Sequence, residues 1–296
     1  LPGFESSDSS RNHRAPTSKA CRALFPLLAA QLYTLFRWAY PGTVTRLQID
    51  ESGRFNYLFI AFGASIDGFP FLCKVIVVEG TFLYGSYKGT LLTSLAQDGN
   101  FQIFPLALGV VDTENDESWR WFFTQLKVVN PDAMDLMIIS DRHKSTAKAI
   151  DEVYPLASHG ICSYHLYKNI LVKFKGKHMF PLVKKAARCF RLTDFNDAFN
   201  EIGECDPNLH GYLQRAGVKM WVGVHFPDDR YSLVTTYIAE SMSKALSNAR
   251  NLSIVRLLEA IRTMMIRWFA ERREDASTQQ TQLTCGVEKW INVTQL

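Results

Sequence analysis

The chain has 296 residues, of which 47% are hydrophobic and 12% aromatic, which is enough for one large core with a satellite or for two compact domains. Its formal net charge of +4 neither requires nor excludes a nucleic-acid partner, so a prediction of nucleic-acid binding must depend on local clusters of cations. The longest apolar stretch is interrupted by Arg22, Pro26, Gln31 and Arg37, which argues against a membrane span, and we expect no membrane partner.

The first 74 residues divide into two predicted parts. Residues 1–18 are polar and rich in Ser, Pro and Arg, and we expect a disordered tail. Residues 19–74 form a predicted helical and hairpin segment, in which a helical pattern runs to about Ala39. The stretch "RFNYLFIAFGASIDGF" then alternates around aromatic residues, which predicts strands that meet at a glycine-bearing hairpin.

Residues 75–165 form the predicted α/β core. Three apolar strands come first, and the Asp98–Gly99 pair between the second and the third predicts a hairpin turn. A helix, a strand, a second helix and a short strand follow, and this order predicts a mixed sheet covered by helices. The segments are "VIVVEG", "GTLLTSLA", "FQIFPLALGVVD", "DESWRWFFTQLKVV", "DLMIISD", "KSTAKAIDEVY" and "SHGICSYH".

The rest of the chain is predicted to be mainly helical. Residues 166–229 contain lysine-rich segments of helical period and no strand pattern, which predicts an all-helical block. Residues 230–275 contain two further helical patterns that would complete the core, and residues 276–296 are predicted to be a C-terminal tail. Because the chain begins with Leu1 rather than Met, we also expect it to be a piece of a longer protein.

Two predicted strands run into a carboxylate. Glu79 follows four apolar strand residues, and Asp141 follows "LMIIS". A partly desolvated carboxylate costs free energy unless a cation or hydrogen-bond donors compensate, and the strand ends of an open sheet are where ligands bind. Two such ends side by side would attract Mg²⁺ or Mn²⁺, which favour hard oxygen ligands. The alternative is that each acid caps the following turn or helix, since Asp141 precedes the helical "KSTAKAI".

Four stretches carry a resemblance to a known family. They are "VEGTFLYGSYKGTLLTSLAQDGNFQIFPLALGVVDTENDESWRWFFTQL", "IISDRHKS", "HGICSYHLYKN" and "TTYIAESMSKALSNAR". In this order, over roughly residues 42–275, the chain resembles the catalytic domain of plant Mutator-like element (MULE) transposases, which belong to the DDE transposases. The resemblance implies a ribonuclease H-like mixed sheet flanked by helices, with an all-helical insertion before the last acidic helix. It also implies a DNA partner and a nuclear location.

The resemblance implies site residues as well. The family's Asp in "VDGTF", Asp in "SDRH" and Glu in "TTNxxESxN" fall on Glu79, Asp141 and Glu240. These three would hold two divalent ions, Mg²⁺ or Mn²⁺, for the cleavage and joining of DNA strands at transposon ends. Transposition of paired ends implies a homo-oligomer, at least a dimer, if the protein is active.

The sequence departs from the family pattern at an important position. Glu79 replaces the expected Asp and adds a methylene, and a misplacement of about 1 Å can cost on the order of a hundredfold in rate. Tyr237 and Ser243 also stand where the family usually has Asn. We therefore expect a transposase fold with weakened catalysis. The alternative function is a catalytically inactive, domesticated or decayed DNA-binding regulator, because the family is similar to the far-red-response regulators of plants.

Cys162 and His165, in "CSYH", have the spacing of half a zinc site. A structural zinc needs four ligands, and Cys189, Cys205 and His210 are only remote candidates for the rest. We therefore favour a buried thiol and a hydrogen-bonded histidine over a zinc site, although a CxxH motif of the family implies that the pair lies near the acids. The six cysteines are scattered and no secretory leader precedes them, so we expect reduced, intracellular thiols.

Residues 173–191 carry seven cations and no acid, with phenylalanines between them. This pattern predicts a surface that follows a DNA backbone by neutralising phosphates; the alternative is a solvated helix face over core aromatics. An insertion-domain Trp lies near the cleaved DNA end in some related transposase folds, which adds Trp221. The predicted DNA-binding residues are Lys173, Lys175, Lys177, Lys184, Lys185, Arg188 and Trp221. His143, beside Asp141, could also reach a phosphate or be an exposed first-turn residue.

Overall fold

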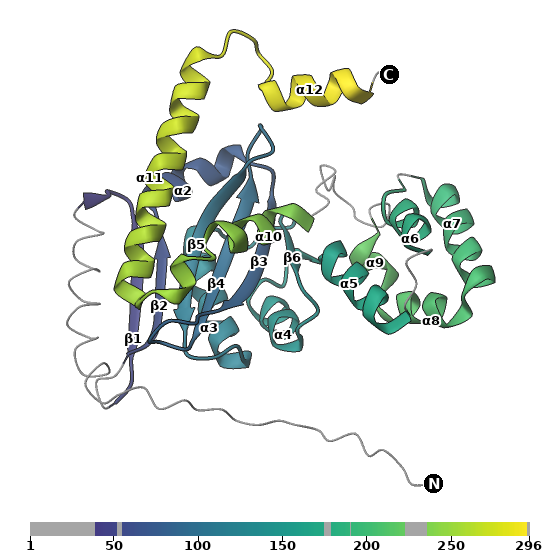
Figure 1. Cartoon of the computed structure of the whole chain (residues 1–296), viewed down its shortest axis with the longest axis horizontal. Coiled ribbons are helices and arrows are strands. Elements are labelled where there is room, and N and C mark those ends of the chain that lie inside the picture. Colours follow the sequence, from purple (N-terminus) through teal and green to yellow (C-terminus); the bar gives the residue numbers. More distant parts are fainter. Residues whose placement is uncertain (1–38, 52–54, 175–178, 190, 223–235, 295–296) are drawn as a thin grey trace.

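The computed structural model describes residues 39–51, 55–174, 179–189, 191–222 and 236–294, so the predicted tail of residues 1–18 lies outside it. The described chain is built on a seven-stranded sheet of order β1-β2-β5-β4-β3-β6-β7 (Figure 1). The strands are β1 (Val44–Ile49), β2 (Phe55–Ala61), β3 (Val75–Phe82), β4 (Thr90–Gln97), β5 (Ile103–Val111), β6 (Met137–Ser140) and β7 (Ser158–Ile161).

The sheet is mixed. β1, β2, β5, β4 and β3 pair antiparallel in that order, whereas β6 runs parallel to β3 and β7 runs parallel to β6. The turn between β4 and β5 is the predicted hairpin, in which Asp98 Oδ1 accepts the N–H groups of Asn100 and Gln102, each at 2.9 Å. The predicted α/β fold class is confirmed, and the arrangement is consistent with a ribonuclease H-like fold.

Helices cover both faces of the sheet (Figure 1). They are α3 (Asp116–Val129) and α4 (Lys144–Val153) on one face, and α10 (Thr236–Ala245) and α11 (Ile254–Thr278) on the other. Ile76 and Val78 of β3 face α3 and α4, whereas Val75 and Val77 face α10 and α11. Because both faces are covered, all four residues of "VIVV" are buried, which explains an unbroken apolar run where a half-exposed strand would alternate.

The start of α3 shows why the helix begins where it does. Asn115 Oδ1 accepts the Ser118 N–H, and Ser118 Oγ accepts the Asn115 N–H, so the two residues form a reciprocal capping box. Asp116 and Glu117 place negative charge in the first turn, where the helix dipole favours it. The cap fixes the position of the loop between β5 and α3, which contributes an acid to the candidate site described below.

Helices α5 to α9 form a lobe that lies at the β7 edge of the sheet (Figure 1). They are α5 (Ser163–Phe174), α6 (Phe180–Ala187), α7 (Leu192–Cys205), α8 (Pro207–Arg215) and α9 (Val218–Trp221). The lobe has a hydrophobic core of its own, which includes Phe195, Phe199 and Trp221. It lies between β7 and α10 in the chain, where the sequence predicted an all-helical block.

The predicted hairpin at Gly63 is wrong. A helix, α2 (Gly63–Gly68), begins there directly after β2, and the Ser65 N–H donates to Phe62 O at 2.9 Å. A Cβ at residue 63 would lie 2.1 Å from Pro41 O, so glycine is needed here for a close backbone approach rather than for a turn. The hairpin of this segment joins β1 to β2 instead.

The predicted C-terminal tail contains a helix, α12 (Cys285–Thr294). It is attached to the turn between β4 and β5, where Thr284 Oγ1 donates to Gly99 O at 2.5 Å and the Gly286 N–H donates to Asn100 Oδ1 at 3.0 Å. These partners are far apart in sequence, so a local pattern could not predict the attachment. Among the described helices, none has the length and apolar character needed to cross a membrane.

Candidate active site and nucleic-acid surface

The carboxyl ends of β3 and β6 place two of the predicted acids side by side. Val77 pairs with Ile139 in the parallel ladder, and the same register continued by two residues brings Glu79 level with Asp141. Neighbouring strands lie about 4.8 Å apart. Both residues are half-buried at the sheet edge where ligands of open α/β sheets bind. That they bind a metal remains a prediction.

Asp141 also forms the turn that leads into α4. Its Oδ1 accepts the His143 N–H at 3.0 Å, and no described residue forms a hydrogen bond with its Oδ2. His143, not Asp141, is the N-cap residue of α4; its side chain is exposed and makes no cap hydrogen bond. The turn interpretation and the ligand interpretation of Asp141 are therefore compatible, because each uses a different carboxylate oxygen.

The backbone of Asp141 is held by Ser140, the last residue of β6, which also contacts the neighbouring strand β7. Ser140 Oγ donates to Asp141 O at 2.8 Å and lies 2.9 Å from His159 Nε2 on β7. Since the hydroxyl proton goes to the carbonyl, we assign the imidazole proton to Nε2, which then donates to Ser140 Oγ. Burial lowers the pKa of His159, against the opposing effect of Asp151 and Asp141, which favours this neutral ring.

A third acid at this edge, Glu114, was not among the predicted site residues. It lies between β5 and α3, and its carboxylate packs over Gly80, where a Cβ would lie 3.0 Å from Glu114 Oε1. Trp119 Nε1 donates to the same oxygen at 3.1 Å. Burial raises the pKa of Glu114 and the charge of Asp141 adds to the rise, while Trp119 and His143 oppose it. An acid that follows a buried strand was the available signal. We call Glu79, Glu114 and Asp141 the acidic edge.

The third predicted ligand, Glu240, lies on α10. This helix packs on β3, and its Met242 shares a core cluster with Val77. Because side chains alternate along a strand, Glu79 lies on the same face of β3 as Val77, the face that α10 covers. The structure therefore places the helix that carries Glu240 on the face of the sheet that carries Glu79. The side chains of Tyr237 and Glu240 lie outside the described residues.

The donors at the acidic edge suit a hard divalent cation in type. Asp141 has an oxygen that forms no hydrogen bond with the described residues, and Glu79 lies level with it on the neighbouring strand. Within the described side chains, no three His, Cys, Asp or Glu residues are close enough to hold a metal ion. A complete set of ligands would therefore need the α10 side chain of Glu240.

Cys162 and His165 lie at the start of α5. Cys162 is buried in the core cluster that α10 also joins, and its carbonyl accepts the Leu166 N–H at 3.1 Å. The remote zinc candidates lie in the lobe, where His210 packs against Phe199 with ring centroids 4.3 Å apart. The described part of the chain thus brings no second pair of ligands to Cys162 and His165.

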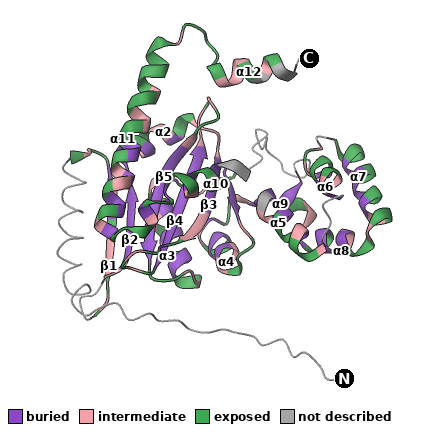
Figure 2. Cartoon of the chain, viewed as in Figure 1, coloured by how far each residue is buried: buried purple, intermediate pink, exposed green. Residues whose placement is uncertain are grey.

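The predicted DNA-binding cations lie on α5 and α6 or directly after them. Lys173, Lys184, Lys185 and Arg188 are exposed, and none forms an ion pair with a described residue. We call these four the basic surface; Lys175 and Lys177 lie outside the described residues. Figure 2 shows that α6 turns an exposed side outward, while Val183 and Ala186 of the same helix join the lobe core. A cationic surface for DNA and a solvated helix face over an apolar core are therefore compatible interpretations of this segment.

Arg142 links the basic surface to the acidic edge. It follows Asp141, and its Nη1 donates to Tyr212 Oη of α8 at 2.5 Å, with the guanidinium 5.1 Å from the ring centroid. Lys173 Nζ lies 5.0 Å from the centroid of the same ring. Both distances are typical of cation–π contacts. One aromatic ring thus contacts a cation of the acid-bearing loop and a cation of the basic surface, so the two regions are adjacent.

The structure contradicts the predicted DNA contact of Trp221. Its side chain is fully buried, with ring centroids 6.3 Å from Phe195 and 6.2 Å from Phe199. Its Nε1 donates to Leu213 O at 3.3 Å, so its polar atom is also satisfied inside the lobe. A large amphipathic ring with a buried hydrogen-bond partner contributes to the core of a small lobe rather than to its surface.

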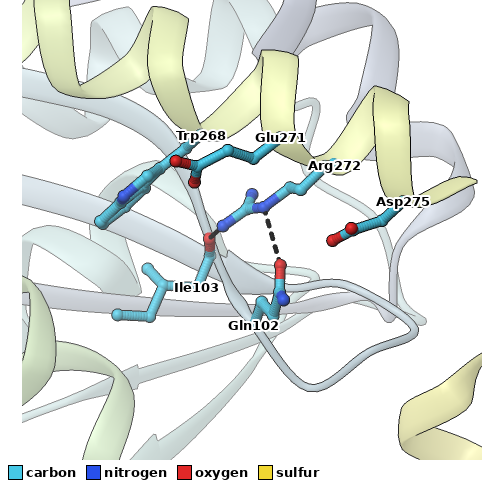
Figure 3. Close-up of a pocket in the computed structure, with 6 residues that line it drawn as sticks. All are labelled: Gln102, Ile103, Trp268, Glu271, Arg272 and Asp275. Atoms are coloured by element: carbon cyan, nitrogen blue, oxygen red, sulfur yellow. Dashed lines mark hydrogen bonds between the residues drawn. The ribbon is translucent and has the colours of Figure 1, made fainter.

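A depression of about 270 Å³ lies between α11 and the turn that joins β4 to β5 (Figure 3). It is lined by Gln102, Ile103, Trp268, Glu271, Arg272 and Asp275. Because β4 runs antiparallel to β3, this turn lies at the opposite end of the sheet from Glu79. Arg272 Nε donates to Gln102 Oε1 at 3.0 Å, and Arg272 Nη2 donates to Ile103 O. These bonds attach α11 to the turn, which is a structural role.

Comparison with known proteins agrees with the motifs. Residues 75–169 match the family described as MULE transposase domain. The chain is 23% identical over 162 residues to "Protein FAR1-RELATED SEQUENCE 6" of Arabidopsis thaliana, covering 53% of this chain and 23% of that protein. It is 25% identical over 114 residues to "PKS-NRPS hybrid synthetase cheA" of Chaetomium globosum, covering 32% of this chain and 2% of that protein. The match spans less than a quarter of the length of each relative. The resemblance to MULE transposases is confirmed by the family match and by the Arabidopsis relative.

Proposed function

We propose that this chain, whose residues 75–169 match a MULE transposase domain, binds DNA and cleaves and joins its strands with divalent ions, at a rate lowered by Glu79. The observation that supports this most directly is the level placement of Glu79 and Asp141 on parallel neighbouring strands, on the sheet face that α10 covers. A DNA substrate makes the nucleus the proposed location.

The acidic residues have distinct proposed roles. Glu79, Asp141 and Glu240 would hold two Mg²⁺ or Mn²⁺ ions, which supply activation of a water or a 3′-hydroxyl and stabilisation of the leaving oxygen. The His143 N–H fixes one oxygen of Asp141, so the other is held in a defined direction. Glu114, fixed by Trp119, would add negative charge beside Asp141 when it is ionised.

Glu79 is the proposed cause of slow catalysis. Its extra methylene moves the carboxylate away from the position that an Asp would give it on the same strand, and the neighbouring strand holds Asp141 in register. A change in the position of the Glu79 carboxylate would therefore alter its distance to Asp141. A displacement of about 1 Å in a reacting group can lower a rate on the order of a hundredfold.

DNA would reach the acidic edge along the basic surface. Lys173, Lys184, Lys185 and Arg188 are not paired with described acids, so phosphates can replace their hydration. The contact of Arg142 and Lys173 with Tyr212 makes this surface continuous with the loop after Asp141. Cleavage at two transposon ends would require a homo-oligomer.

A nicking and strand-transfer assay tests the proposal. Purified protein is incubated with Mn²⁺ and a labelled duplex that carries a terminal inverted repeat. The native chain should cleave slowly, Glu79→Asp should cleave about a hundredfold faster, and Asp141→Ala should be inactive. Asp135→Ala is the matched control, because Asp135 is exposed and precedes β6 at its other end.

The second candidate is a DNA-binding regulator without catalysis, which the substitution at Glu79 favours. Cleavage only by Glu79→Asp would assign the native chain to this second function. Cleavage by Asp141→Ala at the native rate would contradict the proposed site. Cleavage without a preference for the terminal repeat would indicate a nuclease of the same fold.

A further inference from the structure

Two large aromatic side chains are exposed where β3 leaves the sheet. Phe82 is 63% exposed and Tyr84 is 59% exposed, whereas Leu83 between them is buried in the core. In an extended chain, alternate residues point to the same side, so the buried Leu83 directs both rings outward. Phe82 is three residues beyond Glu79, about 10 Å along β3, and its side chain lies on the opposite face of the strand from that of Glu79.

The backbone that carries the two rings is rigid. The Leu83 N–H donates to Gly89 O at 2.9 Å, and the N–H groups of Tyr84 and Gly85 donate to Arg250 O at 2.9 and 3.2 Å. A Cβ at residue 85 would lie 2.0 Å from Leu252 O, so the chain passes directly against the segment that precedes α11. The rings are therefore exposed on a fixed support and not on a loose loop.

The charged side chain that contacts the Tyr84 ring is a cation. Arg250, in the short helix η4 (Ala249–Asn251), places its guanidinium 5.7 Å from the Tyr84 ring centroid. Its Nε is buried without a hydrogen-bond partner, and it forms no ion pair with a described residue. Residues 80–90 and 246–253 contain two cations, Lys88 and Arg250, and no acid, although Glu114 packs over Gly80, two residues before Phe82. A partner with flat apolar faces and an anionic group would complement the two rings and the Arg250 guanidinium.

We propose that Phe82, Tyr84 and Arg250 bind unpaired nucleotides of the DNA strand next to the cleavage site, with bases stacked on the rings and a phosphate on the guanidinium. Every base has a π-face, so aromatic residues bind single strands with little sequence preference. Paired bases inside a duplex are covered by their neighbours and cannot stack on a protein ring. This inference rests on the proposed function, and it adds a preference for DNA whose end is unpaired.

Fluorescence anisotropy with two DNA probes tests the proposal. One probe is a blunt duplex, and the other is the same duplex with a short unpaired thymine overhang of either polarity, both at one salt concentration. The unsubstituted protein should bind the overhang probe more tightly. The double variant Phe82→Ala, Tyr84→Ala should bind it about tenfold more weakly and bind the blunt duplex unchanged. Tyr84→Phe, which keeps the ring, should behave as the unsubstituted protein.

Phe71→Ala is the matched control, because Phe71 is 88% exposed and lies before β3, at the other end of the sheet. It should leave both affinities unchanged. Equal affinity of the unsubstituted protein for the two probes, or an equal loss on both probes in the double variant, would overturn this inference alone. Failure to bind either probe would overturn the proposed function as well. Thermal unfolding of each variant checks that the fold is intact.

Discussion

In the lobe the large aromatic side chains lie inside and the cations outside, whereas at the end of β3 two aromatic side chains lie outside and the acids are half-buried. Trp221 is fully buried, but Phe82 is mostly exposed. The lobe must build a core from a short stretch of chain, so it needs its aromatics for packing. The sheet already has two filled faces, so the exposed aromatics at the end of β3, Phe82 and Tyr84, are not required for its core. Exposure, and not residue type, therefore separates a candidate contact from a structural residue.

The largest effect should come from removing the ring that holds the lobe core. Trp221→Ala deletes a fully buried side chain, and we expect it to lower the free energy of unfolding by about 3–5 kcal/mol. Urea denaturation followed by circular dichroism measures the loss. Trp221→Phe should keep DNA affinity close to the native value. A Trp221→Phe protein with native stability and lost DNA binding would show that Trp221 contacts DNA after all.

Removal of exposed cations should weaken DNA binding and leave the stability of the fold unchanged. Lys184→Gln, Lys185→Gln and Arg188→Gln together should weaken DNA binding about ten- to a hundredfold and lower the slope of log K against log salt by about 2–3, with native stability. The control changes Arg256, Arg267 and Arg273, exposed on α11, to Gln. If the control weakens binding equally, the effect is one of net charge and not of the basic surface.

The hydrogen bond between Arg142 and Tyr212, which joins the acid-bearing loop to the lobe, should contribute less to stability than Trp221. Tyr212→Phe removes the hydroxyl that accepts from Arg142 but keeps the ring for both cations. Because Arg142 is exposed, we expect a loss of about 1 kcal/mol in stability, the usual net value of a protein hydrogen bond. A double-mutant cycle with Arg142→Ala measures the coupling. Zero coupling would mean that the hydrogen bond between Arg142 and Tyr212 contributes nothing to stability.

The smallest effect should be a pH-dependent one at the acidic edge. The pKa of Glu114 is raised by burial, so the folded protein holds this proton more tightly than the unfolded chain, and stability is lost as pH rises through the folded pKa. Glu114→Gln keeps the acceptor for Trp119 and cannot ionise. Without divalent ions, its melting temperature should match the native one near about pH 4 and exceed it slightly near about pH 8. A native advantage at high pH would contradict the assigned burial.

Much of the core could be predicted from the sequence because it depends on local patterns. The apolar run of β3, the Asp98–Gly99 turn and the order of strands and helices after residue 75 all appear in the structure. The helix that begins at Gly63 could not be predicted, because glycine is required there by the close approach of the Pro41 carbonyl and not by a turn. Attachment of α12 to Gly99 and Asn100 was hidden for a similar reason, since the partners are distant in sequence.

For the candidate site, the sequence by itself determined which acids end strands and which segment is cationic. Residue types and their order in the chain suffice for that, because strand ends and helix faces follow from periodicity. Only the tertiary structure decided that Glu79 lies level with Asp141, that Glu114 packs over Gly80 and is affected by the charge of Asp141, and that Trp221 is buried. Strand register, close approach and burial are set by contacts between distant segments, and no local pattern contains them.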